Sequence, residues 1–183
     1  MLARQDGRLL IAGPPGTAGY VERLQELYGD WLAPRRRRLE VREMAVGEVV
    51  DLPGGTATAL PANHPVDRFA SPGQGWLFAD HKGHRLAYTG DTGPCAALAA
   101  AIGACDLLLV ECSTPDALAV ATHLGPTGVC DLVGNTRPRR VVLTHLYPLV
   151  AAEHPHERVA VVTGVATVSA RDGDQFRIPE PTE

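Results

Sequence analysis

Short apolar runs separated by glycine, proline and polar turns recur along the whole chain. Two such runs, at Trp76 to Asp80 and Arg85 to Tyr88, flank a Lys82-Gly83 turn and predict a β-hairpin. The tail, Ala166 to Ile178, predicts one or two further strands. Other runs have the length and aliphatic content of single strands: Leu9 to Ala12, Leu39 to Met44, Thr56 to Leu60, Asp106 to Glu111 and Val141 to Thr144.

Three segments between these strands predict helices. Thr17 is expected to cap a helix that runs to about Tyr28 and carries apolar residues along one face. Ala96 to Ile102 is a helix of small residues, and Thr127 to Asn135 is another helix. In the second half of the chain, strands and helices then alternate. This order predicts layered α/β packing within a single domain that covers residues 1–183.

Composition and charge narrow the class of protein. Apolar residues make up 45% and charged residues 21%, which is typical of a folded domain rather than a disordered chain. The formal net charge of −4 gives no global indication of a nucleic-acid partner. One basic run, Arg35 to Arg38, predicts a solvated loop between a helix and a strand, with a phosphate- or RNA-contacting patch as the alternative.

The cysteines and the N-terminus bear on the compartment. None of the four cysteines forms a Cys-x-x-Cys pair, so a zinc finger is not expected and a reducing compartment fits best. Arg4, Asp6 and Arg8 interrupt the opening before any signal-peptide-like apolar stretch develops. No apolar stretch approaches the roughly 20 residues of a membrane helix. We therefore expect a cytoplasmic protein without a membrane partner.

Three predicted strands end in a residue that can bind a metal ion or transfer a proton. Tyr88 to Gly90 leads to Asp91, Leu108 to Val110 leads to Glu111, and Val141 to Thr144 leads to His145. In α/β sheets, ligands gather outside the carboxyl ends of the strands. The three strand ends therefore predict one shared site.

Four residues are candidates for the chemistry of that site: His64, Asp91, His123 and His145. Each follows an apolar or small-residue segment and precedes a polar, glycine or proline turn. Histidine and aspartate are the nitrogen and oxygen ligands of hydrolytic zinc sites, and one carboxylate can bridge two ions. A histidine at such a position can equally be a structural, hydrogen-bonded residue, and spacing alone leaves both interpretations open.

Several short motifs resemble a known family when they are taken in order. Gly90-Asp91-Thr92 is similar to its "GDT" motif, and Leu143-Thr144-His145 to its closing "LTH" motif. The remaining similarities are the strand and "GP" turn at Leu10 to Pro14, Asn63-His64, and the "EAT…H" pair formed by Glu111-Cys112-Ser113 with Ala121-Thr122-His123. Together, from about Leu9 to the final strand, they resemble the metallo-β-lactamase fold in its ribonuclease Z-like branch.

The resemblance implies an αββα sandwich with a metal site at one edge of the sheets. It implies that His64 ligates a first metal ion, that Asp91 bridges two ions and that His145 ligates the second. It also implies that His123 is a catalytic proton donor or anion-stabilising group, supported by Glu111. The ions would be zinc, with manganese as an alternative, and they would lower the pKa of a bound water for hydrolysis of an ester or phosphodiester.

The sequence departs from the family in one major respect. The family's main ligand motif, His-x-His-x-Asp-His, lies before the "GP" turn, but no histidine precedes His64. Two ligands per ion would remain, fewer than the three or four that hold zinc. The chain thus corresponds to the C-terminal two-thirds of the family fold, with doubtful metal occupancy. We favour a gene fragment, inactive or incomplete alone, over a half-protein and a degenerate homologue.

The partners follow from these alternatives. A half-protein would be completed by a homodimer partner or by a separate N-terminal half. A degenerate homologue would be a catalytically silent α/β domain that binds partners through its exposed N-terminal edge. The 26 residues between His64 and Asp91 leave no room for the tRNA-gripping arm of some ribonuclease Z enzymes. We therefore expect a small ester, phosphodiester or lactone substrate rather than tRNA.

The other histidines are expected to have no catalytic part. His81 and His84 flank the predicted hairpin turn and should be solvated. His154 and His156 lie in a proline-containing segment, where no second metal site is expected.

Overall fold

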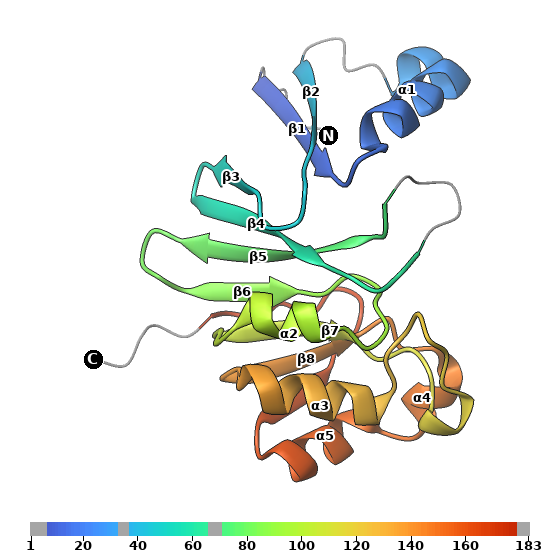
Figure 1. Ribbon diagram of the computed structural model, residues 1–183, viewed down its shortest axis with the longest axis vertical. Helices are drawn as coiled ribbons and strands as arrows, with labels where there is room; N and C mark the ends of the chain where they lie inside the picture. The colour runs from blue at the N-terminus through green and yellow to red at the C-terminus, as the bar shows by residue number, and fades with distance from the viewer. Residues whose placement is uncertain (1–6, 33–36, 66–70, 179–183) are drawn as a thin grey trace. The chain divides into compact units, whose positions relative to one another are not determined.

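The computed structural model describes residues 7–32, 37–65 and 71–178 (Figure 1). By contacts the chain divides into two compact units. The first consists of residues 1–45 and 66–71, and the second of residues 46–65 and 72–183. The expectation of a single domain over residues 1–183 stays a prediction.

The first unit contains a pair of parallel strands and a helix. β1 (Gly7–Gly13) pairs with β2 (Arg37–Glu43) and places Leu9 beside Leu39. Between them lie α1 (Thr17–Tyr28) and the short 3-10 helix η1 (Gly29–Trp31). The predicted strands and helix are therefore confirmed. The start of the basic run, Arg35 and Arg36, lies outside the described residues, whereas Arg37 and Arg38 open β2 rather than a loop.

The expectation that Thr17 caps α1 is wrong. The cap residue is Gly16, whose φ of 102° lies in the left-handed region that glycine adopts without strain. The Thr17 hydroxyl instead donates to the Pro14 carbonyl at 2.6 Å. The carboxylate of Glu43, at the end of β2, accepts from the backbone N–H groups of Gly16 and Ala18 at 2.9 and 3.1 Å. A residue distant in sequence therefore satisfies the free N–H groups of the helix start.

The second unit is built on a seven-stranded sheet in which the strands lie in chain order (Figure 1). The first four strands pair antiparallel, and the last four, from β6 onward, pair parallel. The hairpin between β5 and β6 is the predicted one. The strands are β3 (Val49–Leu52), β4 (Gly55–Pro61), β5 (Gln74–Asp80), β6 (Arg85–Tyr88), β7 (Leu107–Glu111), β8 (Arg140–Thr144) and β9 (Ala166–Ser169).

Each parallel connection passes through at least one helix, as crossovers between parallel strands require. The helical elements are α2 (Ala96–Ile102), η2 (Asp116–Leu118), α3 (Pro126–Thr136), α4 (Pro148–Ala152) and α5 (Pro155–Thr163). α2 packs on β4 and on α3, and α3 packs on α5. The core between helices and sheet includes Leu98, Val110, Val129 and Leu143, each no more than 1% exposed. The predicted layered α/β class is therefore confirmed.

Two details of the second unit differ from expectation. The segment after Tyr147 forms α4 and α5, although its prolines did not predict helices. His84 is buried rather than solvated, because the tight turn folds its ring back onto Asp80, with Nδ1 2.7 Å from a carboxylate oxygen. The largest effect on the pKa of Asp80 comes from this His84 contact, which lowers it. His81, on the turn itself, is exposed as expected.

Candidate metal centre

The carboxyl ends of three neighbouring parallel strands meet at one edge of the sheet. Asp91 follows β6, Glu111 is the last residue of β7, and His145 follows β8 directly. Thr89 ties the first two ends together, because its hydroxyl accepts from the Glu111 N–H at 3.3 Å and donates to the Gly90 carbonyl at 2.7 Å. The structure thus brings together the side chains that the three strand ends predicted.

Asp91, His123 and His145 form a cluster that can hold a metal ion. One ligand atom from each lies within 4.8 Å of the others. Nε2 of His145 and Oδ2 of Asp91 are 3.6 Å apart, too far for a hydrogen bond. Two atoms that share one zinc ion in a tetrahedron, at about 2.1 Å each, lie about 3.4 Å apart. The observed separation therefore suits a shared ion better than a direct contact.

A second observation supports this fit. Nε2 of His145 is buried and has no hydrogen-bond partner among the described residues. A buried polar atom without a hydrogen-bond partner lowers the stability of the folded state. Its presence at this position therefore needs an explanation. The donor set, two imidazoles and a carboxylate, is the type that zinc and manganese accept. The residues present therefore fit the metal that the fold family implies.

Glu111 orients the ring of His123. The carboxylate is 1% exposed and lies 2.9 and 3.2 Å from Nδ1 of His123. The same carboxylate accepts from the Thr92 backbone N–H at 2.6 Å. Because an ionised carboxylate only accepts, Nδ1 carries the hydrogen and Nε2 is the free nitrogen of His123. A carboxylate behind a histidine is the usual way in which a ligating imidazole is held in one orientation.

His64 lies beside this cluster but outside the three-residue group. Its ring centroid is 4.9 Å from that of His123. Its Nδ1 donates to the Thr122 carbonyl at 3.1 Å, which again leaves Nε2 free. The structure thus groups Asp91 and His145 with His123, which the resemblance implied to be a proton donor or an anion-stabilising group. The specific role of each residue stays a prediction.

Contacts between three loops hold the site residues in place, and sequence reasoning did not predict these contacts. The Asn63 backbone N–H donates to the Thr92 hydroxyl at 2.9 Å, and the Asn63 side chain donates to the Ala121 carbonyl at 3.2 Å. A Cβ on Gly93 would lie 1.8 Å from that same carbonyl, so only glycine fits there. The loops before His64, after Asp91 and before His123 are thereby locked together.

The backbone of His145 is strained. Its φ of 54° lies in the left-handed region, which costs a non-glycine residue roughly 1–2 kcal/mol. Such conformations persist where surrounding structure imposes them, and they are common at functional sites. Here the strain accompanies the turn from β8 toward α4, at the residue whose Nε2 faces Asp91.

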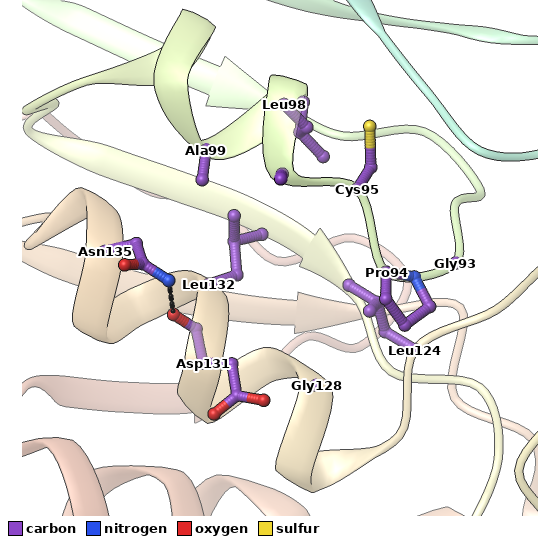
Figure 2. A pocket seen from close by; sticks show the side chains of 11 residues that line it. Gly93, Pro94, Cys95, Leu98, Ala99, Leu124, Gly128, Asp131, Leu132 and Asn135 are labelled. Atoms are coloured by element: carbon purple, nitrogen blue, oxygen red, sulfur yellow. Dashed lines mark hydrogen bonds between the residues drawn. The ribbon is translucent and has the colours of Figure 1, made fainter.

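A small cavity lies between α2 and α3, close to the group formed by Asp91, His123 and His145 (Figure 2). Its volume is about 190 Å³. Figure 2 shows Leu98, Ala99 and Leu132 at the gap between the two helices. Gly93 and Leu124, which also line it, adjoin the loops of Asp91 and His123. None of these three residues lines the cavity. The cavity is therefore adjacent to the candidate metal site and is not part of it.

A family model described as the β-lactamase superfamily domain matches residues 1–146. The chain belongs to this superfamily. Its members are metal-dependent hydrolases, and the resemblance drawn from the "GDT" and "LTH" motifs is confirmed at that level. The more specific assignment to a ribonuclease Z-like branch stays a prediction.

Curated relatives of this superfamily member are mycobacterial and uncharacterized. The protein Rv1339 of Mycobacterium tuberculosis is 29% identical over 160 residues, which are 82% of this chain and 54% of that protein. The protein ML1173 of Mycobacterium leprae is 28% identical over 155 residues, which are 82% of this chain and 52% of that protein. The chain therefore spans about half the length of the curated relatives it matches.

Solved structures share the fold. The metallo-β-lactamase fold protein YhfI from Bacillus subtilis aligns with a TM-score of 0.72 at 18% identity, over 91% of this chain and 64% of that chain. Human tRNase Z, short form, aligns with a TM-score of 0.65 at 19% identity, over 96% and 70%. A diphosphatase from the PhnP family aligns with a TM-score of 0.64 at 15% identity, over 91% and 56%. At these identities the likeness concerns the fold alone.

Within residues 7–32, 37–65 and 71–178, no helix combines the length and apolarity needed to cross a bilayer.

Proposed function

We propose that this chain contributes the centre of a metal-dependent hydrolase that cleaves a phosphodiester or ester bond. The observation that carries the proposal is the group formed by Asp91, His123 and His145. In it, Nε2 of His145 is buried and has no hydrogen-bond partner among the described residues. Membership in a superfamily of metal-dependent hydrolases supports it. When bound, the metal would supply Lewis acidity and an activated water.

The site residues have distinct tasks in this proposal. Asp91 and His145 would hold the ion, since Oδ2 of Asp91 and Nε2 of His145 face each other. Glu111 holds the hydrogen on Nδ1 of His123, so that Nε2 of His123 points its lone pair into the cluster. His64 presents a free Nε2 beside it, fixed through the Thr122 carbonyl, as a ligand for a first metal ion next to the bridging Asp91.

His123 can act as a third metal ligand or as a proton donor, and the two roles predict different metal contents. As a third ligand it would complete the three protein ligands that a catalytic zinc site requires. As a proton donor it would leave only Asp91 and His145, too few to retain an ion at low concentration. We favour the first role for this chain, because its ligand atom lies in the same 4.8 Å group. One ion per chain is then expected, held by Asp91, His123 and His145, because His64 and Asp91 alone are too few ligands to retain another ion.

The proposed substrate is a small ester or phosphodiester. The net charge of −4 gives no global attraction for a polyanion, and only 26 residues separate His64 from Asp91. One solved structure with this fold is described as a diphosphatase and another as a tRNase. Of these two kinds of substrate, the small one fits the charge and the short connection of this chain.

Elemental analysis of the purified chain, after equilibration with zinc or manganese and removal of free metal, tests the proposal. We expect close to one ion per chain, and close to none in Asp91→Ala, because the carboxylate is central to the cluster. His81→Ala is the matched control, since His81 is an exposed histidine on the hairpin turn, and it should retain the ion. Equal metal content in Asp91→Ala would show that the ion binds elsewhere.

His123→Ala then separates the two parts proposed for this residue. Loss of the ion identifies a ligand, whereas retention identifies a proton donor. Hydrolysis of bis(p-nitrophenyl) phosphate and p-nitrophenyl acetate by the loaded chain tests the reaction itself. A chain that binds the ion yet cleaves neither compound would limit the proposal to metal binding.

A further inference from the structure

Four rings stand in a row across the candidate metal centre. The centroids of His64 and His123 are 4.9 Å apart, those of His123 and His145 are 5.5 Å apart, and those of His145 and Tyr147 are 5.0 Å apart. The three imidazoles have parts in the proposed metal chemistry. Tyr147, at the end of the row, has none, so its place needs another explanation.

Exposure increases from His123 to Tyr147 along the row. The side chains of His123 and His145 are 15 and 32% exposed, and Tyr147 as a whole residue is 48% exposed. This end of the row therefore leads from a mostly buried imidazole outward to a half-exposed aromatic ring, which is where a molecule entering from solvent would meet it.

The backbone fixes the position of Tyr147. It is the cap residue of α4, its carbonyl accepts from the Ala151 N–H at 2.9 Å, and Pro148 begins the helix behind it. A single exposed apolar side chain is ordinary on a protein surface. This ring is different because it contacts the imidazole of His145, a candidate metal ligand.

We propose that Tyr147 is a specificity-determining residue that packs against an aromatic ring of the substrate, next to the reacting phosphoryl or acyl group. The inference rests on the proposed function and deepens it, because it names aryl phosphodiesters and aryl esters as the substrate class. Aromatic rings attract one another at centroid distances of about 4.5–7 Å. A ring bonded to a group held between Asp91 and His145 would fall within that range of Tyr147, since Tyr147 already lies 5.0 Å from His145.

Equilibrium binding tests this without requiring turnover. The probes are phenylphosphonate and methylphosphonate, which share the anionic head and differ in the ring. Each is titrated by calorimetry or proton NMR into the full, metal-loaded chain. We expect phenylphosphonate to bind about 2- to 10-fold more tightly than methylphosphonate, the range that one aromatic pair contributes. Tyr147→Ala should remove this advantage, and Tyr147→Phe should keep it.

The matched control is Tyr28→Ala, which deletes another half-exposed tyrosine, located on α1 in the first unit. It should leave the ratio of the two dissociation constants unchanged. If Tyr147→Phe loses the advantage as Tyr147→Ala does, the hydroxyl rather than the ring is responsible and the inference is wrong. If both phosphonates bind equally to the unaltered chain, the inference fails while the proposed function stands. If neither binds, both fail together.

A second pair of probes identifies the source of the ring. Adenosine 5′-monophosphate and ribose 5-phosphate differ by a nucleobase that a sugar separates from the phosphate. Because Tyr147 is next to His145, a ring joined directly to the reacting group should gain more than a nucleobase does. A Tyr147-dependent advantage larger for the nucleotide pair than for the phosphonate pair would overturn the assignment to aryl substrates.

Discussion

The carboxylate of Glu111 serves both the fold and the candidate site. Burying a charge is costly unless hydrogen bonds compensate for the lost water. Here the Thr92 N–H donates to Oε1 at 2.6 Å, and Nδ1 of His123 donates to the same carboxylate. Glu111 therefore ties the loop that follows Asp91 to the loop that carries His123.

Glu111→Gln should weaken both metal binding and the fold. The glutamine oxygen can still accept from Thr92 and, at 2.9 Å, from Nδ1 of His123, but the amide N–H₂ takes the place of Oε2, 3.2 Å from the same nitrogen. Its hydrogens oppose the hydrogen on Nδ1 and favour the tautomer that carries the hydrogen on Nε2, where it cannot ligate. We expect a 10- to 100-fold loss of metal affinity, as is usual for such supporting residues. The stability loss should be about 1–3 kcal/mol.

Competition with a chromophoric chelator gives the affinity, and urea unfolding of the metal-free chain gives the stability. An unchanged affinity in Glu111→Gln would mean that His123 is not a ligand.

Sequence pattern predicted the ligand types but not the residues that position them. Asp91, Glu111 and His145 were visible because each ends a strand. The positioning roles of Asn63 and Gly93 were not visible. These roles depend on contacts with residues up to 58 positions away, which no local pattern records. For the same reason a buried His84 and an exposed His81 could not be told apart.

At the scale of elements, Asp116 joins three segments. Its carboxylate accepts from the Thr127 N–H at 3.1 Å and from the Thr127 hydroxyl and Arg158 at 2.6 Å each. It thereby connects three elements: η2, the start of α3, and α5. Burial alone would raise the pKa of Asp116, but the hydrogen bonds from Thr127 and Arg158 outweigh it and hold the pKa below its ordinary value.

Asp116→Asn should destabilise the second unit in a pH-dependent way. A carboxyl whose folded pKa is lowered contributes stability above its unfolded pKa of about 4, and this is lost as pH falls through the folded value. The difference in unfolding free energy between the variant and the unaltered chain should be no more than about 1 kcal/mol at pH 7, because the group is partly exposed. It should shrink below pH 4.

Urea unfolding at pH 7 and at pH 3 measures this difference. Asp131→Asn, on the exposed side of α3, is the control and should stay within about 0.5 kcal/mol of the unaltered chain. A difference between Asp116→Asn and the unaltered chain that is equal at both pH values would show that ionisation of Asp116 contributes nothing.

The predicted elements were most accurate where one signal dominated. β7 and β8 are continuous aliphatic runs, and α2 has the predicted bounds, Ala96 to Ile102. α4 and α5 were not predicted, although both begin with proline. In both helices proline occupies the first turn, where its missing N–H has no partner to lose.

At the scale of the whole molecule, all candidate ligands belong to one of the two compact units. His64, Asp91, His123 and His145 lie in the second unit, on the connections that follow β4, β6, β7 and β8. An ion held by Asp91, His123 and His145 would cross-link three of these connections. The first unit contains none of these ligands, so its stability should not depend on the metal.

This separation makes metal-linked stability the last prediction. An ion that binds only the folded state stabilises it by about 2.7 kcal/mol at a free concentration one hundred times its dissociation constant. In thermal unfolding with zinc, the transition of the second unit should move to higher temperature by several degrees, while any separate transition of the first unit stays in place. Asp91→Ala should show no shift, and His81→Ala the full shift. An equal shift in Asp91→Ala would place the stabilising ion outside the cluster, because that variant removes the carboxylate to which Nε2 of His145 is opposed.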